Sequence, residues 1–268
     1  MSPMVLLILG AGRGVGRSVT AAAFADSLAL AGVPVTLCAI APPYLATDLR
    51  DSSSISTSDH ITEVSAEVLL RHGQRPSGAA VLALDSPNPQ LREPLGFFGR
   101  HLVPDPSVWL QAAGESQVLV VDASWDSLEV VGERRDHMAA WLQQPSGVSV
   151  YPMIVTPASR PAVAATSQLL AAIEGYRAAL AGRLESGAGI GPSSLLVPRS
   201  RSGTAEAFTH VASTHGSVDV KDAVTNGQVT HLPEDDKLLA GIGEKTPVGL
   251  LNAVREALYR CGAAKEAA

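Results

Sequence analysis

The 268-residue chain is long enough to bury a sizeable core, and its composition excludes several classes of protein. A net charge of −6 argues against a broad nucleic-acid interface, because binding phosphates along a strand requires a basic face. Two cysteines, Cys38 and Cys261, exclude a disulfide framework, and no apolar run reaches the roughly 18 residues of a membrane span. We therefore expect a cytoplasmic protein without a transmembrane segment, which a partner recruits if it reaches a membrane or a cell pole.

The first 42 residues predict a strand, a glycine-rich loop, a helix and a second strand. An apolar run, Val5–Leu9, precedes the loop, and an Ala-rich helical pattern follows it and ends near Gly32. The next apolar run covers Val33–Ile40. A glycine-rich turn between a buried strand and a helix is typical of phosphate-binding loops, because backbone N–H groups point at the ligand there.

Two interpretations of this loop are open. Gly10–Gly16 fits the dinucleotide loop of short-chain dehydrogenases, whereas Gly14–Ser18 fits the end of a P-loop, GxxxxGK[ST], with Arg17 in place of lysine. The 16-residue separation of Gly16 and Gly32 favours the longer first helix of P-loop proteins over the dehydrogenase spacing of about 11. A dehydrogenase also needs Tyr-x-x-x-Lys, and no tyrosine here has a lysine four residues later. The P-loop is therefore the favoured interpretation.

The pattern between residues 43 and 116 is less regular. We predict a polar loop over Asp51–His60, an amphipathic helix over Ile61–His72 and a strand over Ala79–Leu84. Two more helices are expected over Leu91–Leu102 and Pro106–Ala113. The large aromatic side chains of these two helices are expected in the core: Phe97, Phe98 and Trp109.

The second strong motif is Gln117–Asp122, QVLVVD. Four aliphatic residues before a carboxylate describe a central parallel strand whose Asp emerges at the carboxyl edge, where open α/β sheets bind ligands. In a P-loop protein this Asp orients the magnesium shell. The alternative is a structural role, in which Asp122 caps the next turn.

The C-terminal half alternates predicted strands and helices. Strands are expected over Val148–Thr156, Ser194–Val197 and Val229–Leu232, a turn over Gly187–Pro192, and helices over Asp126–Gln144, Ala162–Leu184, Lys237–Ile242 and Pro247–Cys261. His210 and His215 have no convincing metal-ligand partner, so both are expected to be ordinary surface or loop residues. The order of elements implies one α/β domain, residues 1–268, with a mostly parallel central sheet and helices on both faces.

Along nearly its whole length the chain resembles the MinD/ParA family of deviant Walker A ATPases. Five family motifs have counterparts in the family order: Ala11–Ser18, Val35–Pro42, Gln117–Asp122, Val150–Ile173 and Leu232–Val248. The segment 79–123 is most similar to the pilus-localisation branch, which is TadZ/CpaE-like. The resemblance implies a P-loop NTPase fold, ATP or ADP with Mg²⁺ as cofactors, and a homodimer.

The resemblance also implies which residues form the nucleotide site. The residues that it assigns to nucleotide binding are Gly12, Arg13, Gly14, Val15, Gly16, Arg17, Ser18, Val19, Asp122, Arg199 and Pro233. The expected magnesium residues are Ser18 and Asp122. No residue is assigned a catalytic role.

Several positions depart from the family pattern where catalysis needs charge. Gly12 stands at the signature lysine, Arg17 at the P-loop lysine and Pro198 at the base-contacting asparagine. Ala39 and Ala41 stand at two aspartates, the first of which helps to place the attacking water. Because phosphoryl transfer depends on positioned charge, these losses predict hydrolysis that is slower by about 10²–10⁴.

Four functions are weighed against these motifs. The first is a hydrolysis-deficient, dimeric scaffold that positions a protein partner in a cell-envelope, pilus, secretion, conjugation or partition machinery, or at a division site. The second is a slow but active ATPase switch. The third is a P-loop ligase of the dethiobiotin or cobyrinate type, and a short-chain dehydrogenase is the least favoured.

Overall fold

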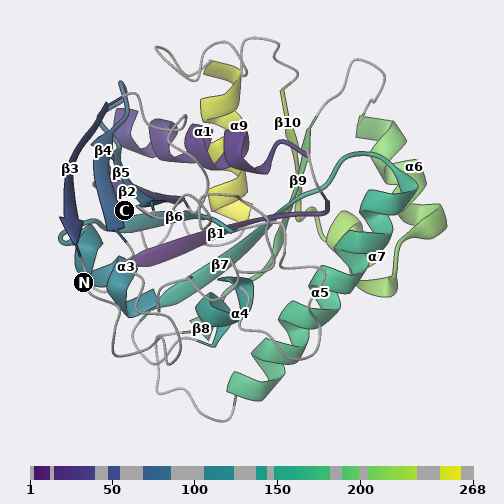
Figure 1. The fold of residues 1–268 in the computed structure, drawn as a ribbon. Coiled ribbons are helices and arrows are strands. Elements are labelled where there is room, and N and C mark those ends of the chain that lie inside the picture. Colours follow the sequence, from purple (N-terminus) through teal and green to yellow (C-terminus); the bar gives the residue numbers. More distant parts are fainter. Residues whose placement is uncertain are drawn as a thin grey trace.

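The aliphatic run at the start of the chain forms an inner strand of a sheet that has ten strands within the described residues (Figure 1). The computed structural model describes residues 3–12, 15–39, 48–54, 69–85, 106–123, 137–143, 148–181, 189–198, 205–233 and 248–260. The strands are β1 (Met4–Gly10), β2 (Val35–Ala39), β3 (Asp48–Ser54), β4 (Leu69–Gln74), β5 (Ala80–Asp85), β6 (Val118–Asp122), β7 (Ser149–Val155), β8 (Gly189–Ile190), β9 (Ser194–Pro198) and β10 (Val229–Leu232). The helices are α1 (Arg17–Leu30), α3 (Pro106–Ala113), α4 (His137–Leu142), α5 (Arg160–Leu180), α6 (Ala205–His215), α7 (Val218–Thr225) and α9 (Val248–Arg260).

The sheet is mostly parallel, as the sequence predicts. Its strand order is β10-β9-β7-β1-β6-β2-β5-β4-β3, and the short β8 pairs with β7. β1 lies between β6 and β7 and is parallel to both, whereas β4 runs antiparallel to its neighbours β3 and β5. Since parallel strands end at one edge, the loop after β1 and the carboxylate that ends β6 are brought to the same side of the molecule.

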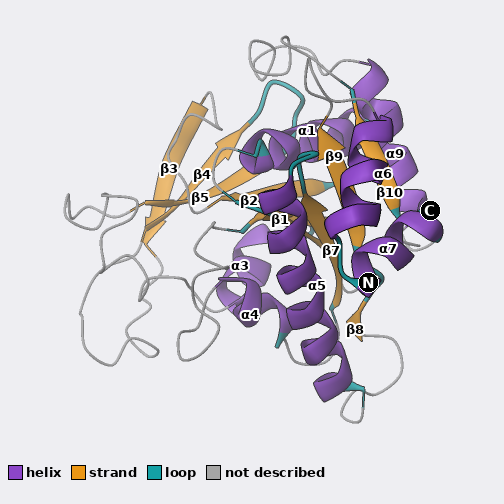
Figure 2. Cartoon of the chain, turned by 90° about the vertical axis from the view of Figure 1, so that its right-hand side faces the viewer, coloured by secondary structure: helices purple, strands orange, loops and turns teal. Residues whose placement is uncertain are grey.

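Helices cover both faces of the sheet, which explains the unbroken aliphatic runs (Figures 1 and 2). Along β1, Leu6 and Ile8 enter the core beneath α1 and α9, and Leu7 and Leu9 enter the opposite core beneath α3 to α7. Trp109 of α3 is fully buried in that second core, as expected. The fold class predicted from the sequence is therefore confirmed.

Two predictions for the middle of the chain are wrong. Asp51–His60 is not wholly a loop, because Asp51 to Ser54 belong to β3, and Ile61–His72 is not wholly a helix, because Leu69 to His72 belong to β4. A polar sequence forms β3 because this strand lies at the edge of the sheet, where alternation of apolar residues is not required. β4 is a strand because it pairs with β5, and such pairing overrides local propensity.

Most other predicted elements lie within a few residues of their expected positions, including the helix α3 and the final helix α9. In the expected turn Gly187–Pro192, residues 189–190 form β8 beside β7. His210 and His215 are exposed residues of α6. The helices predicted over Leu91–Leu102 and Lys237–Ile242, with Phe97 and Phe98, lie outside the described residues. Within the described residues, no helix has both the length and the apolar character that crossing a membrane demands.

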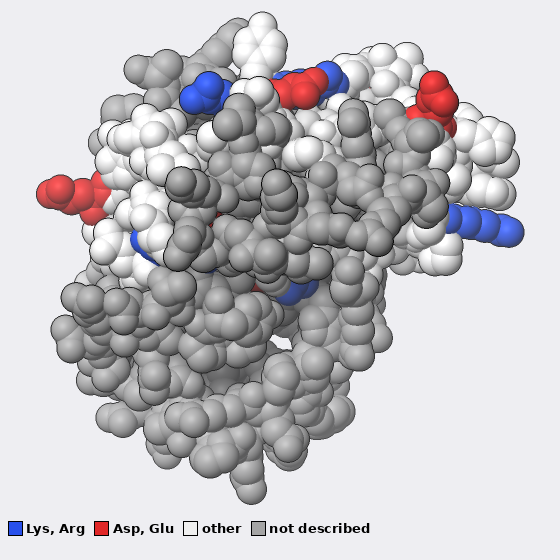
Figure 3. Space-filling model, turned by 90° about the horizontal axis from the view of Figure 1, so that it is seen from above, with Lys and Arg blue, Asp and Glu red and all other residues white. Residues whose placement is uncertain are grey.

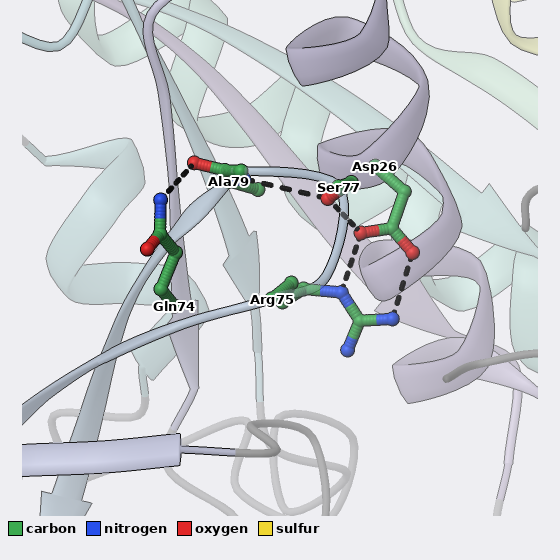
Figure 4. A network of polar contacts seen from close by, with 6 residues as sticks. Asp26, Gln74, Arg75, Ser77 and Ala79 are labelled. Atoms are coloured by element: carbon green, nitrogen blue, oxygen red, sulfur yellow. Dashed lines mark hydrogen bonds and ion pairs between the residues drawn. The ribbon is translucent and has the colours of Figure 1, made fainter. Parts of the chain in front are cut away.

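A buried ion pair ties α1 to the turn between β4 and β5 (Figure 4). Arg75 donates from Nε to Asp26 Oδ1 at 2.6 Å and from a terminal nitrogen to Oδ2 at 2.7 Å. Ser77 Oγ donates to the same Oδ1 at 2.5 Å and accepts from the Ala79 amide at 3.3 Å. The side chain of Arg75 is 1% exposed, so this bidentate pair is part of the core.

Cys38 lies in β2 as a free and fully buried thiol, and burial raises its pKa far above the ordinary value of 9.0. In a Cys261→Ser variant we therefore expect the native protein to react with an aromatic disulfide reagent only as fast as it unfolds, and denatured protein to react at once. Because the folded pKa is raised, this thiol also lowers stability as the pH rises above about 9. Prompt reaction of native protein at pH 8 would contradict the buried position of β2.

Candidate functional site

The loop after β1 is shaped by glycines. Ala11 donates its amide to Val155 O at 3.0 Å, which holds the start of the loop against β7. Gly12 and Gly16 then adopt φ values of 144° and 85°. A residue with a side chain would be strained at these positive φ values. A Cβ on Gly10 would lie 3.0 Å from Val15 Cγ2. Glycines are thus required for the chain to turn from β1 into α1; the predicted site residues Arg13 and Gly14 lie outside the described residues.

The N-terminus of α1 is a natural place for an anion. Gly16 is its N-cap residue and offers no side chain, and the first turn holds no acidic residue. The first helical bond runs from the Thr20 amide to Gly16 O, so the amides of Ser18 and Val19 have no acceptor within the helix. These amides carry the positive end of the helix dipole, and both residues are half-buried.

The predicted cation and the predicted carboxylate of the site are paired with each other. Arg17 Nε donates to Asp122 Oδ1 at 2.5 Å, across 105 residues of sequence. The Arg17 side chain is 12% exposed and that of Asp122 is fully buried. In this position the pair is a short, charge-assisted hydrogen bond that water screens poorly. The charge that would contact phosphate and the charge that would orient magnesium therefore neutralise one another.

Magnesium fits this arrangement poorly. Asp122 Oδ1 is engaged by a guanidinium, and Oδ2 is the oxygen left, buried and without a hydrogen-bond partner among the described residues. The described part of the chain contains no group of three or more His, Cys, Asp or Glu that could hold a metal. Ser18, the other expected magnesium residue, is half-buried in the first turn of α1. A divalent cation would have to bind beside Arg17, where two cations repel.

The sequence matches no protein-family model and no curated protein. Solved structures match almost the whole chain. An ATP complex of a McdA variant from Cyanothece superposes with a TM-score of 0.56 at 11% identity, covering 97% of this chain and 96% of that one. The cell division ATPase MinD of Pyrococcus furiosus gives 0.54 at 14% identity, covering 97% and 99%. The chain has the MinD/ParA fold. The resemblance seen in the motifs is therefore confirmed at the level of the fold.

A solved synthase is also similar to this chain in fold. Cobyrinic acid a,c-diamide synthase of Mycobacterium smegmatis, solved with ADP and magnesium, superposes with a TM-score of 0.52 at 15% identity, covering 96% of this chain and 92% of that one. Its score is close to those of McdA and MinD. The fold alone therefore does not separate a scaffold from a ligase, and the residues at the carboxyl edge must do so.

The remaining predicted residues are spread along that edge of the MinD/ParA fold. Ala39 ends β2 directly beside Asp122, on the same face, and is 1% exposed. Pro198 ends β9, and Pro233 follows β10 at the end of the strand order, three strands from β1. Ala41 and Arg199 lie outside the described residues. The structure thus brings together Gly12, Val15, Gly16 and Arg17 to Val19 with Asp122, and places Pro233 farther away.

Sequence reasoning missed that Arg17 and Asp122 are partners. The sequence does carry a signal for this pair, because the P-loop motif and the strand-end Asp predict both residues in one small site and their charges are opposite. Sequence reasoning also missed the Asp26–Arg75 pair, for which the sequence offers no comparable motif.

Proposed function

We propose that this chain is a MinD/ParA-like protein with a degenerate P-loop, a nucleotide-binding pseudo-ATPase that acts as a dimeric scaffold and positions a partner machinery. The observation that carries the proposal is the 2.5 Å contact between Arg17 and Asp122. The proposal includes a single domain, residues 1–268. In it the fold is kept, and the two charged groups expected at the phosphate and the metal are paired with each other. The finer assignment, to the TadZ/CpaE-like pilus-localisation branch, is part of the proposal.

Weak or absent hydrolysis follows from the charges at the carboxyl edge. Catalysis of phosphoryl transfer requires cations on the transferring phosphate and a carboxylate free to organise the metal. Here Arg17 holds Asp122, and Ala39 supplies no carboxylate beside it. Gly12 occupies the place of the signature lysine at φ 144°, where a lysine would be strained. Two of the charges that the reaction needs are thus occupied by each other, at Arg17 and Asp122, and two are missing, at Ala39 and Gly12.

Nucleotide binding survives these changes in our proposal. The amides at the start of α1 and the outer nitrogens of Arg17 remain able to hold phosphate. Two proteins of this fold carry such ligands: the McdA variant was solved with ATP, and the cobyrinic acid synthase with ADP and magnesium. We therefore assign ATP or ADP to this chain, bound by residues 12–19 beside Asp122, with Arg199 and Pro233 as the outer contacts.

The partner is proposed to be a protein. MinD of Pyrococcus furiosus, which has a similar fold, is a cell division ATPase. In the view of Figure 3, acidic and basic side chains of the described residues are interspersed, and the described part of that face shows no broad basic patch. A cell-envelope, secretion, conjugation or partition machinery would recruit the dimer from the cytoplasm to a membrane or a pole.

The proposal is tested by measuring phosphate release and molar mass on the same preparation. With ATP and Mg²⁺ we expect phosphate release at the level of a protein-free blank, and light scattering that gives a dimer in the presence of nucleotide. Robust release that Arg17→Ala abolishes would overturn the pseudo-ATPase. A monomer under every nucleotide condition would count against the scaffold.

The second candidate is a slow ATPase switch, which is favoured by the retained cation at Arg17. In that case ATP would draw Arg17 away from Asp122, and phosphate release would be slow but measurable and lost in Arg17→Ala. A ligase, the third candidate, would need an organic substrate before ADP forms. Tight binding of NADPH would instead indicate a dehydrogenase and would exclude the P-loop assignment.

A further inference from the structure

We infer that the phosphate site of this chain binds its nucleotide without Mg²⁺, because the guanidinium of Arg17 takes the place of the metal between Asp122 and the phosphate. This inference rests on the proposed function, since it concerns the same site. It goes further because it specifies the form in which the ligand binds: a nucleoside diphosphate or triphosphate without a metal ion.

Asp122 is already engaged by Arg17. A P-loop carboxylate helps magnesium by orienting an octahedral shell of oxygens and waters. Arg17 Nε lies 2.5 Å from Asp122 Oδ1, and both side chains are largely buried. Ala39, beside Asp122 on the next strand, supplies no second carboxylate. One carboxylate thus faces one guanidinium, and Asp122 Oδ1 is not free to orient a magnesium shell.

The guanidinium of Arg17 has donors left for a phosphate after it has bound Asp122. Its Nε is engaged by Asp122, and the described residues provide no hydrogen-bond partner for its two terminal nitrogens. A guanidinium presents planar donors that match two phosphate oxygens, which a lysine cannot do. The Arg17 side chain as a whole is 12% exposed. Arg17 can therefore bridge the carboxylate and a phosphate.

Two features of the site other than Arg17 also indicate a ligand: the first turn of α1 and the second oxygen of Asp122. The first turn of α1 has neither a capping side chain nor an acidic residue, so its amides are open to an anion. Asp122 Oδ2 is buried and has no hydrogen-bond partner among the described residues. A water or a ligand O–H satisfies that oxygen without adding a second cation.

Calorimetric titration with ADP, at constant ionic strength in EDTA and in Mg²⁺, tests the inference. For the natural chain we expect the two dissociation constants to agree within about 3-fold. In Arg17→Lys the compact ammonium leaves Asp122 accessible to a metal, so Mg²⁺ is expected to tighten ADP binding by about 10-fold or more. Inorganic phosphate in EDTA, as a second probe, is expected to compete with ADP.

Asp122→Asn gives a second test that remains available if Arg17→Lys does not fold. Removing the carboxylate frees Arg17 and removes a charge that repels phosphate, so we expect ADP to bind more tightly, by about 3- to 10-fold, with or without Mg²⁺. A magnesium site would behave in the opposite way, and the variant would lose affinity in Mg²⁺. Thermal melting of both variants establishes that they are folded.

Two results would overturn the inference: a gain of 10-fold or more in the ADP affinity of the natural chain on adding Mg²⁺, or no binding of ADP and phosphate in EDTA. Its failure is separable from failure of the proposed function. A protein that needs Mg²⁺ to bind ADP but forms a dimer and releases no phosphate from ATP is still a pseudo-ATPase scaffold. Phosphate release that depends on Arg17 would contradict the proposed function itself.

Discussion

Replacing Asp26 by alanine is expected to lower the free energy of unfolding by about 3–5 kcal/mol. Arg75 is held by both oxygens of Asp26, and its side chain is 1% exposed. Without the carboxylate the buried guanidinium would lose the negative charge that Asp26 supplies, and the turn between β4 and β5 would lose its bidentate contact with α1. Urea unfolding followed by circular dichroism measures the loss.

A matched control comes from an exposed pair. Arg260 donates to Glu256 on the surface of α9, and the two side chains are 32% and 49% exposed, so Glu256→Ala is expected to cost less than about 1 kcal/mol. The double variant Asp26→Leu/Arg75→Met removes both charges together and should be much more stable than Asp26→Ala alone. Equal losses for Asp26→Ala and Glu256→Ala would show that the Asp26–Arg75 pair is not buried in solution.

Restoring a carboxylate at Ala39 is expected to destabilise the protein and to leave phosphate release at the blank. Ala39 is 1% exposed and lies beside Asp122 on the same face of the sheet, so an aspartate there would place a second buried carboxylate next to the first. Arg17 can neutralise one of them. Keeping the new group protonated at pH 7 would cost about 3–4 kcal/mol, measured as a loss of unfolding free energy against Ala39→Asn.

The pH dependence separates this charge effect from a packing effect. Because burial raises the folded-state pKa of the introduced carboxyl above its unfolded value of about 4, the deficit against Ala39→Asn should be greatest near pH 7 and shrink as the pH falls toward 5. A deficit that is the same at both pH values would indicate packing alone. If Ala39→Asp were as stable as Ala39→Asn, a second carboxylate beside Asp122 would carry no penalty. A further cation would then be neutralising it, which would argue for a metal at the site.

The elements around the candidate site were predictable because they are buried on both faces. β1 and β6 appear in the sequence as short aliphatic runs, since a central parallel strand needs apolar residues at every position. α1 was predictable from the glycines at its two ends and the Ala-rich pattern between them. The wrong predictions fell on β3 and β4, whose conformation depends on an antiparallel neighbour and not on a local pattern.

The sequence by itself determined the P-loop order of strand, loop, helix and strand, the placement of Asp122 at a strand end, and the absence of a carboxylate at Ala39. These features are local, because they depend on residue type and spacing within one or two elements. The tertiary structure decided which groups touch. Arg17 and Asp122 are 105 residues apart, and Asp26 and Arg75 are 49 apart, so each pair exists only because the sheet places α1 over β6 and beside the β4–β5 turn. The predicted phosphate cation became the partner of the predicted magnesium ligand for this reason.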